Sequence, residues 1–209
     1  SSVTHATPAA FYAHVNNRYK EKEIASQLQS SNINIAFGGG LNFFDLNVNN
    51  EQIKYIYELD ELNNINTSSS KRIIGLFDND GIRRASFRPS QQLMTKKALD
   101  ILSKRTAKCS GFFLMTEGSQ IDWASHDNDA SRMIIEFRDF DLSIKTAVEF
   151  INARDDTLLI VTADHETGGL QILKEDKDSV HIQWGTGRHT GIPVGIFSYG
   201  PGADLFTGT

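Results

Sequence analysis

Two short segments of this chain concentrate carboxylate and imidazole side chains directly after apolar runs. The first runs from Glu117 to His126 (EGSQIDWASH) and the second from Thr162 to Glu166 (TADHE). A third segment, Gly187–Gly191 (GRHTG), adds another histidine. Carboxylate oxygens and imidazole nitrogens are ligands for zinc and magnesium in hydrolytic enzymes. The segments therefore predict a hydrolytic site with more than one metal ion, although no candidate nucleophile stands out in the 209 residues.

The spacing within these segments indicates how a first ion would be held. Asp122 and His126 are four residues apart, so one helical turn would place both side chains on the same face. His189 would arrive from a separate loop. One carboxylate and two imidazoles leave a fourth position open, which is typical of a catalytic zinc site. Each pair alone is more commonly a hydrogen-bonded pair than a metal site, so the prediction depends on the joint pattern.

Other residues offer ligands for further ions. Asp164 and His165 are adjacent, and at the end of a strand both could reach a second ion. Glu117 and Thr7 supply hard oxygen atoms that suit magnesium. His14 and His181 are interpreted as structural residues.

Apolar runs alternate with helical patterns along the chain, which predicts an α/β fold with a mainly parallel central sheet flanked by helices. Functional residues in such folds gather beyond the carboxyl ends of strands, where the segments after Met115 and Val161 lie. A helix is expected to begin at Thr7-Pro8, with Thr7 as its cap, and to stop at Asn16-Asn17. The other expected helices cover 20–29, 94–104 and 128–153, and the expected strands cover 33–37, 71–77, 111–115, 156–162, 180–184 and 193–198.

The chain is expected to form a single domain over residues 1–209. Residues 45–71 are rich in Asn and Ser, which favours a surface insertion with little order. The triplet Gly38–Gly40 favours a turn with close backbone approach. A phosphate cradle is the alternative, but the Lys-Ser/Thr of a P-loop is absent.

Composition bounds the classes of partner. The net charge of −5 and the pI of about 5.7 argue against a nucleic-acid binder that relies on overall charge. The single cysteine, Cys109, excludes an intrachain disulfide and is interpreted as a small, partly buried residue. No apolar stretch is long enough to span a membrane, and the first residues show no export signal.

Taken in chain order, these segments resemble the alkaline phosphatase family. The match rests on Thr4–Ala10 (THATPAA), Asn17-Arg18, Glu117–His126 and Thr162–His165, followed by His189-Thr-Gly191; Phe37–Gly40 is a looser match. The resemblance implies an incomplete alkaline-phosphatase-like fold. It also implies hydrolysis of phosphate monoesters through a phosphoserine, at two zinc ions and a third, usually magnesium, ion.

The resemblance implies a role for each matching residue. Asp122, His126 and His189 would hold the first zinc, and Asp164 with His165 would hold the second. Thr7 and Glu117 would belong to the magnesium site. Arg18 would bind two phosphate oxygens with its planar fork. His5 and Trp123 would lie beside the metals, and His5 offers an alternative in which the third ion is zinc.

Thr7 and Arg18 can serve the same site only if the helix between them is short. A straight helix would separate their backbones by about 16 Å. Both could serve one site only if the helix ended or bent early, and Asn16-Asn17 make an early end plausible.

The sequence departs from the family pattern in one respect. The family's nucleophilic serine, in an Asp-Ser-Ala-type segment, and a bridging aspartate both precede the Thr-Pro helix, and neither has a match here. The second and third sites are thus expected to be short of ligands. This leaves an alternative in which the chain is an inactive metal-binding fragment, because loss of a nucleophile cost another hydrolase about 10⁶ in kcat.

Rival interpretations come from the same and other classes. A sulfatase or phosphodiesterase of the same superfamily is the nearest enzyme. A non-catalytic interaction module would hold no zinc, and a nucleotide-binding domain has only the glycine triplet in its support. Family resemblance further implies small phosphate monoester substrates, a homodimer, and a periplasmic or extracellular location.

Overall fold

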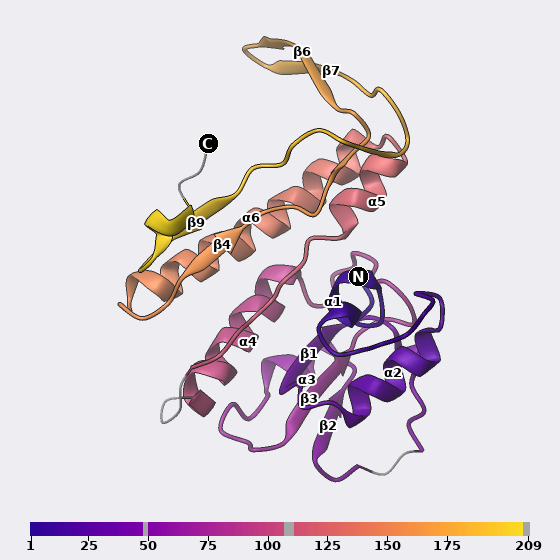
Figure 1. Cartoon of the computed structure of the whole chain (residues 1–209), viewed down its shortest axis with the longest axis vertical. Coiled ribbons are helices and arrows are strands. Elements are labelled where there is room, and N and C mark those ends of the chain that lie inside the picture. The colour runs from indigo at the N-terminus through magenta and orange to yellow at the C-terminus, as the bar shows by residue number, and fades with distance from the viewer. Residues whose placement is uncertain (48–49, 107–110, 207–209) are drawn as a thin grey trace. The chain divides into compact units, whose positions relative to one another are not determined.

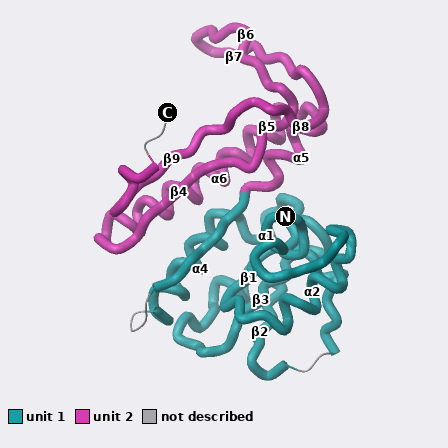
Figure 2. The backbone as a smooth tube through the Cα atoms, in the orientation of Figure 1, with its two compact units in different colours: residues 1–117 teal, residues 118–209 magenta. Residues whose placement is uncertain are grey.

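The computed structural model describes residues 1–47, 50–106 and 111–206. The chain divides into two compact units, residues 1–117 and residues 118–209 (Figure 2). The expectation of one domain over residues 1–209 stays a prediction. Cys109, interpreted above as a partly buried residue, lies outside the described residues.

A three-stranded parallel sheet forms the centre of unit 1 (Figure 1). Strand β3 (Arg72–Leu76) lies between β1 (Ile35–Gly38) and β2 (Ile53–Ile56). The register pairs Phe37 of β1 with Gly75, and Tyr55 of β2 with Ile74. Ile73, Ile74 and Leu76 are almost completely buried, as expected of a central strand covered on both faces.

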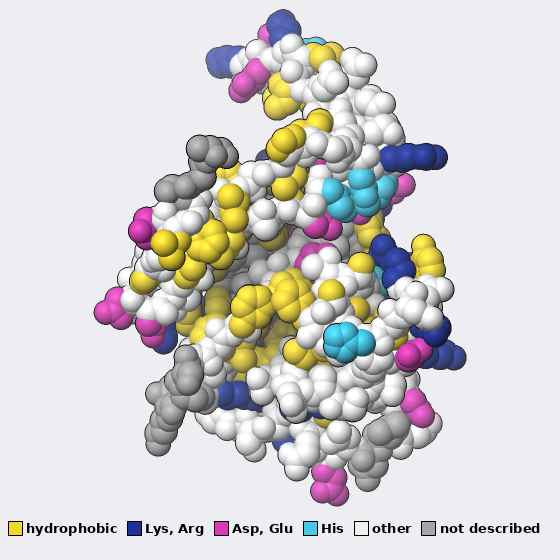
Figure 3. Space-filling view, in the orientation of Figure 1, with side chains coloured by type: hydrophobic (Ala, Val, Ile, Leu, Met, Phe, Trp, Pro, Cys, Tyr) yellow, Lys and Arg dark blue, Asp and Glu magenta, His cyan; other side chains and the backbone are white. Residues whose placement is uncertain are grey.

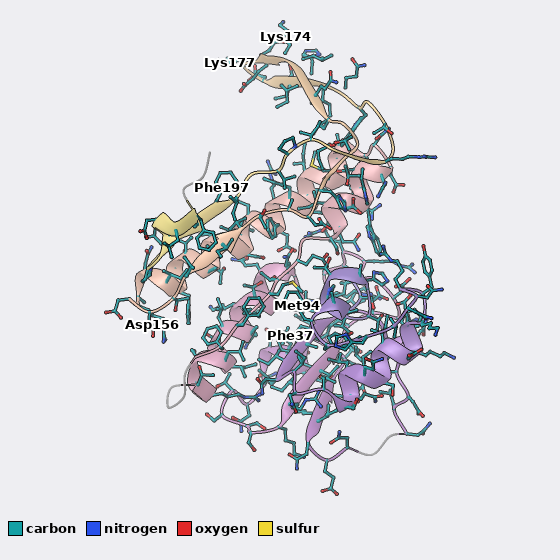
Figure 4. All side chains as sticks on the ribbon, viewed as in Figure 1. Phe37, Met94, Asp156, Lys174, Lys177 and Phe197 are labelled. Carbon is teal, nitrogen blue, oxygen red and sulfur yellow. The ribbon has the colours of Figure 1, made fainter. Side chains whose placement is uncertain are left out.

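Helices cover this sheet and supply its core. Helices α2 (Glu21–Ser30), α3 (Leu59–Asn63) and α4 (Gln91–Thr106) belong to this unit, together with the short 3₁₀ helix η1 (Leu41–Phe43). Leu28 of α2 packs in one core cluster with Ile74, and Ile101 of α4 packs in a second with Ile73. Phe37 and Met94, labelled in Figure 4, pack against the second cluster.

Helix α1 (Ala6–Ala10) is much shorter than the sequence pattern predicted. Thr7 is the second helical residue and not the cap, because the cap position belongs to His5, which makes no side-chain cap hydrogen bond. The prediction of Thr7 as the cap was therefore wrong. Pro8 still falls in the first turn, where a missing N–H costs nothing. The chain leaves the helix after Ala10, well before Asn16, so the condition of an early helix end is met.

Residues 45–71, predicted as a surface insertion, contain exposed and buried residues, and the insertion itself stays a prediction. The stretch contains β2 and α3, and Ile56 and Leu62 from it are fully buried. Ile56 and Leu62, together with Ile65, belong to a core cluster of unit 1, while most other described residues of this stretch are exposed. The strand segment Ile53–Ile56 is itself mostly apolar, but it is only four residues long and lies between Asn- and Ser-rich residues.

The glycine triplet serves close backbone approach, as expected. A Cβ atom on Gly39 would lie 1.6 Å from the carbonyl oxygen of Asp80, so no side chain fits there. The amides of Gly39 and Gly40 donate to the carbonyls of Ser1 and Asp78. Amides committed in this way are not available to a phosphate group.

Unit 2 is built on the long helix α6 (Ala130–Asn152), which confirms the helix predicted at 128–153. Helix α5 (Gln120–His126) packs on α6, as does strand β4 (Leu159–Val161) (Figure 1). Strand β4 pairs with β9 (Phe197–Tyr199), and Figure 4 labels Phe197 on that strand. The 3₁₀ helix η2 (Ala203–Phe206) follows β9.

Two further strand pairs complete unit 2. Strand β5 (Glu166–Thr167) pairs with β8 (His189–Thr190), and β6 (Gln171–Asp176) pairs with β7 (Ser179–Gln183). The second pair is a hairpin with Lys174 on β6 and Lys177 in its turn (Figure 4). Among the described residues of this unit, these two pairs and that of β4 with β9 are antiparallel.

The α/β class with a parallel sheet is confirmed, while single strands differ from the predicted bounds. Residues 111–115 form no strand, because no described segment is hydrogen-bonded beside them to form a ladder. Within the described ranges, none of the helices has the length and apolar character needed to cross a bilayer.

Candidate metal centre

Helix α5 brings Asp122 and His126 together on one face. The atoms His126 Nε2 and Asp122 Oδ1 are 3.5 Å apart, across one helical turn. The helix ends after His126 because Asn128 adopts a left-handed conformation with φ of 53°. Asp129 then accepts a hydrogen bond from the amide of Arg132 and so caps α6. Asp122 and His126 thus lie on one helical turn, as predicted, and Asn128 and Asp129 end that helix and begin the next.

His189 reaches the same place from β8. The ladder of β5 and β8 sets Thr167 opposite His189 and Glu166 opposite Thr190. His189 Nε2 lies 3.0 Å from His126 Nε2 and 3.4 Å from Asp122 Oδ1. All three ligand atoms lie within 4.8 Å of one another, so the structure gathers the three residues expected for the first zinc.

The donor set fits zinc in both spacing and protonation. Ligands about 2.0–2.1 Å from a tetrahedral zinc lie about 3.4 Å apart, close to the three separations found here. The Nδ1 atom of His126 lies 2.8 Å from the carbonyl oxygen of Gly187, which can only accept a hydrogen bond. Nδ1 therefore donates to this carbonyl, so Nε2, on the side of His189, is the nitrogen placed to bind a metal ion. Figure 3 shows histidine side chains gathered beside acidic ones on the surface.

Asp164 and His165 lie just after β4, as expected for residues at a strand end. His165 Nε2 is 3.2 Å from the Oδ2 atom of Asp164. The imidazole of His165 stacks on that of His189, with ring centroids 3.5 Å apart and an angle of 23° between the planes. The pair expected for a second ion therefore adjoins the first group of ligands.

Thr167 is a residue of this cluster that the sequence pattern did not single out. Its hydroxyl donates to Asp122 Oδ1 and lies 3.2 Å from the Nδ1 atom of His165. One hydroxyl thus contacts a residue expected at the first ion and a residue expected at the second. A threonine two positions after the Asp-His pair was the available signal, but its hydrogen bonds depend on the fold of β5.

Four other residues predicted for the site do not belong to the cluster of Asp122, His126 and His189. Trp123 lies on α5, next to Asp122. Thr7, Arg18 and Glu117 belong to unit 1; Thr7 and Glu117 are half-buried, and Arg18 is exposed in a turn. The gathering of these three residues around the centre in unit 2 stays a prediction.

His5 contacts two carboxylates within unit 1. Its Nε2 atom lies 3.1 Å from Asp80 and 3.6 Å from Glu21. Glu21 also accepts a 2.6 Å hydrogen bond from the hydroxyl of Thr4. His14 lies outside both clusters, and His181 pairs with Asp176 on the hairpin, 3.3 Å away.

Comparison with known proteins identifies relatives for nearly the whole chain. Residues 1–179 match the family model described as alkaline phosphatase. Alkaline phosphatase 4 of Bacillus subtilis is 36% identical over 198 residues, which cover 88% of this chain and 42% of that protein. The alkaline phosphatase of Schizosaccharomyces pombe is 32% identical, with 84% and 38% covered.

Solved structures give the same result. The alkaline phosphatase of the Antarctic bacterium TAB5 superposes with a TM-score of 0.85 at 37% identity, covering 99% of this chain and 65% of that one. A mutant of the TAB5 enzyme, with a TM-score of 0.82 and 33% identity over the same shares, is described with Mg bound in its M3 site. A cold-active enzyme from Shewanella has a TM-score of 0.87 at 28% identity, covering 98% and 69%. The chain spans about two fifths of the length of the curated relatives it matches.

Proposed function

The chain belongs to the alkaline phosphatase family, and we propose on this premise that the protein hydrolyses phosphate monoesters at a centre built around Asp122, His126 and His189. The observation that carries the proposal is the convergence of these three side chains from α5 and β8 with separations that suit a tetrahedral ion.

Four further residues are proposed as ligands of a second and a third metal ion. Asp164 and His165 would hold a second zinc, which the stacking of His165 on His189 supports. Thr7 and Glu117 would hold magnesium, since their oxygen atoms suit a hard cation. Zinc is the alternative at this third position, with His5 as its additional ligand. When bound, the ions would stabilise negative charge on the attacking and leaving oxygens of the ester.

Side chains of this chain would also bind and orient the substrate. Arg18 would bind two phosphate oxygens through its planar guanidinium, and its exposed position leaves those N–H groups accessible. Trp123 would lie beside the centre, since it follows Asp122 on α5. The hydroxyl of Thr167 would fix the side chains of Asp122 and His165 relative to each other.

The remaining parts of the proposal concern the whole protein. A serine in an Asp-Ser-Ala-type segment would be the nucleophile, and no such segment occurs in the 209 residues. Small phosphate monoesters are the proposed substrates, a homodimer the proposed assembly, and the periplasm or extracellular space the proposed location. Metal binding without turnover is the alternative for these residues by themselves.

Two measurements test the proposal. Elemental analysis after dialysis should find zinc on the chain, and a chain without zinc would contradict the assigned centre. Turnover of a chromogenic phosphate monoester should then be compared with that of a phosphodiester and a sulfate ester. Preference for either of the latter would instead support the phosphodiesterase or sulfatase alternative.

A further inference from the structure

Glu166 accepts three hydrogen bonds through its carboxylate, although it is not one of the proposed metal ligands. Its Oε2 atom accepts from the hydroxyl of Thr190 and from the amide of Gly169, 3.2 Å away. Its Oε1 atom accepts from the amide of Leu170 at 3.3 Å. The side chain is only half-exposed, so these three donors hold one carboxylate in place.

A glycine turn places the backbone amides that donate to Glu166. Gly168 and Gly169 adopt positive φ values of 95° and 57°, which residues with a Cβ atom rarely adopt. The resulting turn points successive amides at the carboxylate, an arrangement that suits an anion. The same turn binds the segment before β8, because the amide of Gly168 donates to the carbonyl of Arg188 at 2.9 Å.

The strand pair relates Glu166 to the metal centre. Neighbouring residues of a strand face opposite sides, whereas residues directly opposite in an antiparallel pair share a side. Thr167 and His189 therefore share the side of the metal ligands, and Glu166 and Thr190 share the other. Fixing Thr190 on one side consequently fixes the backbone that carries His189 toward the other.

We infer that Glu166 is a positioning residue, whose carboxylate clamps Thr190 and the 168–170 turn so that His189 meets Asp122 and His126 at the distance an ion needs. The inference rests on the proposed function only for the identity of the ion. The clamp acts through the backbone and does not touch the ion or the substrate.

Substitution of Glu166 and Thr190 in the full chain separates this role from general stability. Glu166→Gln keeps the size but turns an amide donor toward donors, and Thr190→Val removes the hydroxyl while it keeps the shape. Thr190→Ser restores the hydroxyl. Glu175→Gln, an exposed carboxylate on β6, is the matched control. The readouts are the zinc dissociation constant, the visible spectrum of Co²⁺ bound in place of zinc, and amide hydrogen exchange of the metal-free chain.

The clamp predicts a specific pattern. Glu166→Gln and Thr190→Val should each weaken zinc binding about tenfold, alter the Co²⁺ spectrum, and speed exchange at Gly169 and Leu170 while leaving α6 protected. The double variant should be little worse than either single variant. Thr190→Ser and Glu175→Gln should resemble the unmodified chain.

Other results would overturn the inference. Unchanged zinc affinity in Glu166→Gln would refute it, as would faster exchange throughout unit 2, which indicates a purely structural role. If the unmodified chain bound no zinc, the proposed function would fail. The exchange pattern of residues 166–170 and 188–190 would still decide whether the clamp exists.

Discussion

The Nε2 atoms of His126 and His189 lie 3.0 Å apart although the two residues are 63 positions apart in the chain. The proton of His126 is held on the opposite nitrogen by the carbonyl of Gly187. Both Nε2 atoms also lie within 3.5 Å of the carboxylate of Asp122. Two imidazole nitrogens and a carboxylate oxygen at these separations suit a cation placed between them.

The first prediction concerns the ligands themselves. His126→Asn and His189→Asn should each weaken zinc binding by more than about 100-fold, since loss of a direct ligand should exceed the 10–100-fold cost of losing a supporting residue. Zinc affinity measured against a competing chelator tests this. His181→Asn is the control, because His181 pairs only with Asp176 on the hairpin among the contacts described. Equal affinity in all three variants would remove these histidines from the centre.

The second prediction concerns Thr167, whose hydroxyl contacts Asp122 and His165. Thr167→Val keeps the shape but removes the hydroxyl, so zinc affinity should fall about tenfold. Thr167→Ser should restore most of it. If Val and Ser variants bound zinc equally, the hydroxyl would have no part in holding the ligands.

The convergence of Asp122 and His126 was predictable because the two residues are close in sequence, whereas the assignment of zinc to them stays a prediction. Asp122 and His126 are one helical turn apart, and the family resemblance joins them to His189 on specific motifs. The contributions of Thr167 and Glu166 were not predictable, because they depend on which residues face each other in a two-residue strand pair. Such short strands have no periodicity that a sequence can reveal.

The elements of the fold were likewise predictable where their sequence pattern is long and not where they depend on distant residues. Helix α6 has a long apolar pattern and was predicted within two residues at each end. Strand β2 lies in an Asn- and Ser-rich stretch, and its apolar residues become core residues by pairing with β3 and packing against residues distant in sequence. Residues 111–115 have the composition of a strand, yet a strand also needs a hydrogen-bonded neighbour.

The third prediction tests the glycine turn of unit 1. Gly39→Ala should lower the free energy of unfolding by about 1–3 kcal/mol or more, because the new Cβ would collide with the backbone oxygen of Asp80. Denaturant unfolding of the full chain measures this change. Gly191→Ala is the control, since no atom lies within 4 Å of its added Cβ. Similar midpoints for both variants would show that the turn relaxes at no cost.

The fourth prediction concerns the behaviour of unit 1 in alkali. Burial, followed by the nearby charge of Glu21, raises the pKa of the Tyr12 phenol well above its ordinary value. The phenol donates a 2.7 Å hydrogen bond to the carbonyl of Val3. The folded chain therefore retains a proton that the unfolded chain loses above about pH 10.

The sign of the pH effect follows from that difference. Below about pH 10 both states keep the proton, so the contribution of Tyr12 is constant. Above it the unfolded state binds fewer protons, and stability should fall by up to about 1.4 kcal/mol per pH unit until folded Tyr12 ionises.

Tyr12→Phe should cost about 1 kcal/mol at neutral pH but should abolish this part of the decline. Urea unfolding between pH 8 and pH 11 measures both effects, with Tyr19→Phe as an exposed control. A decline equally steep in Tyr12→Phe would assign the alkaline instability to other groups.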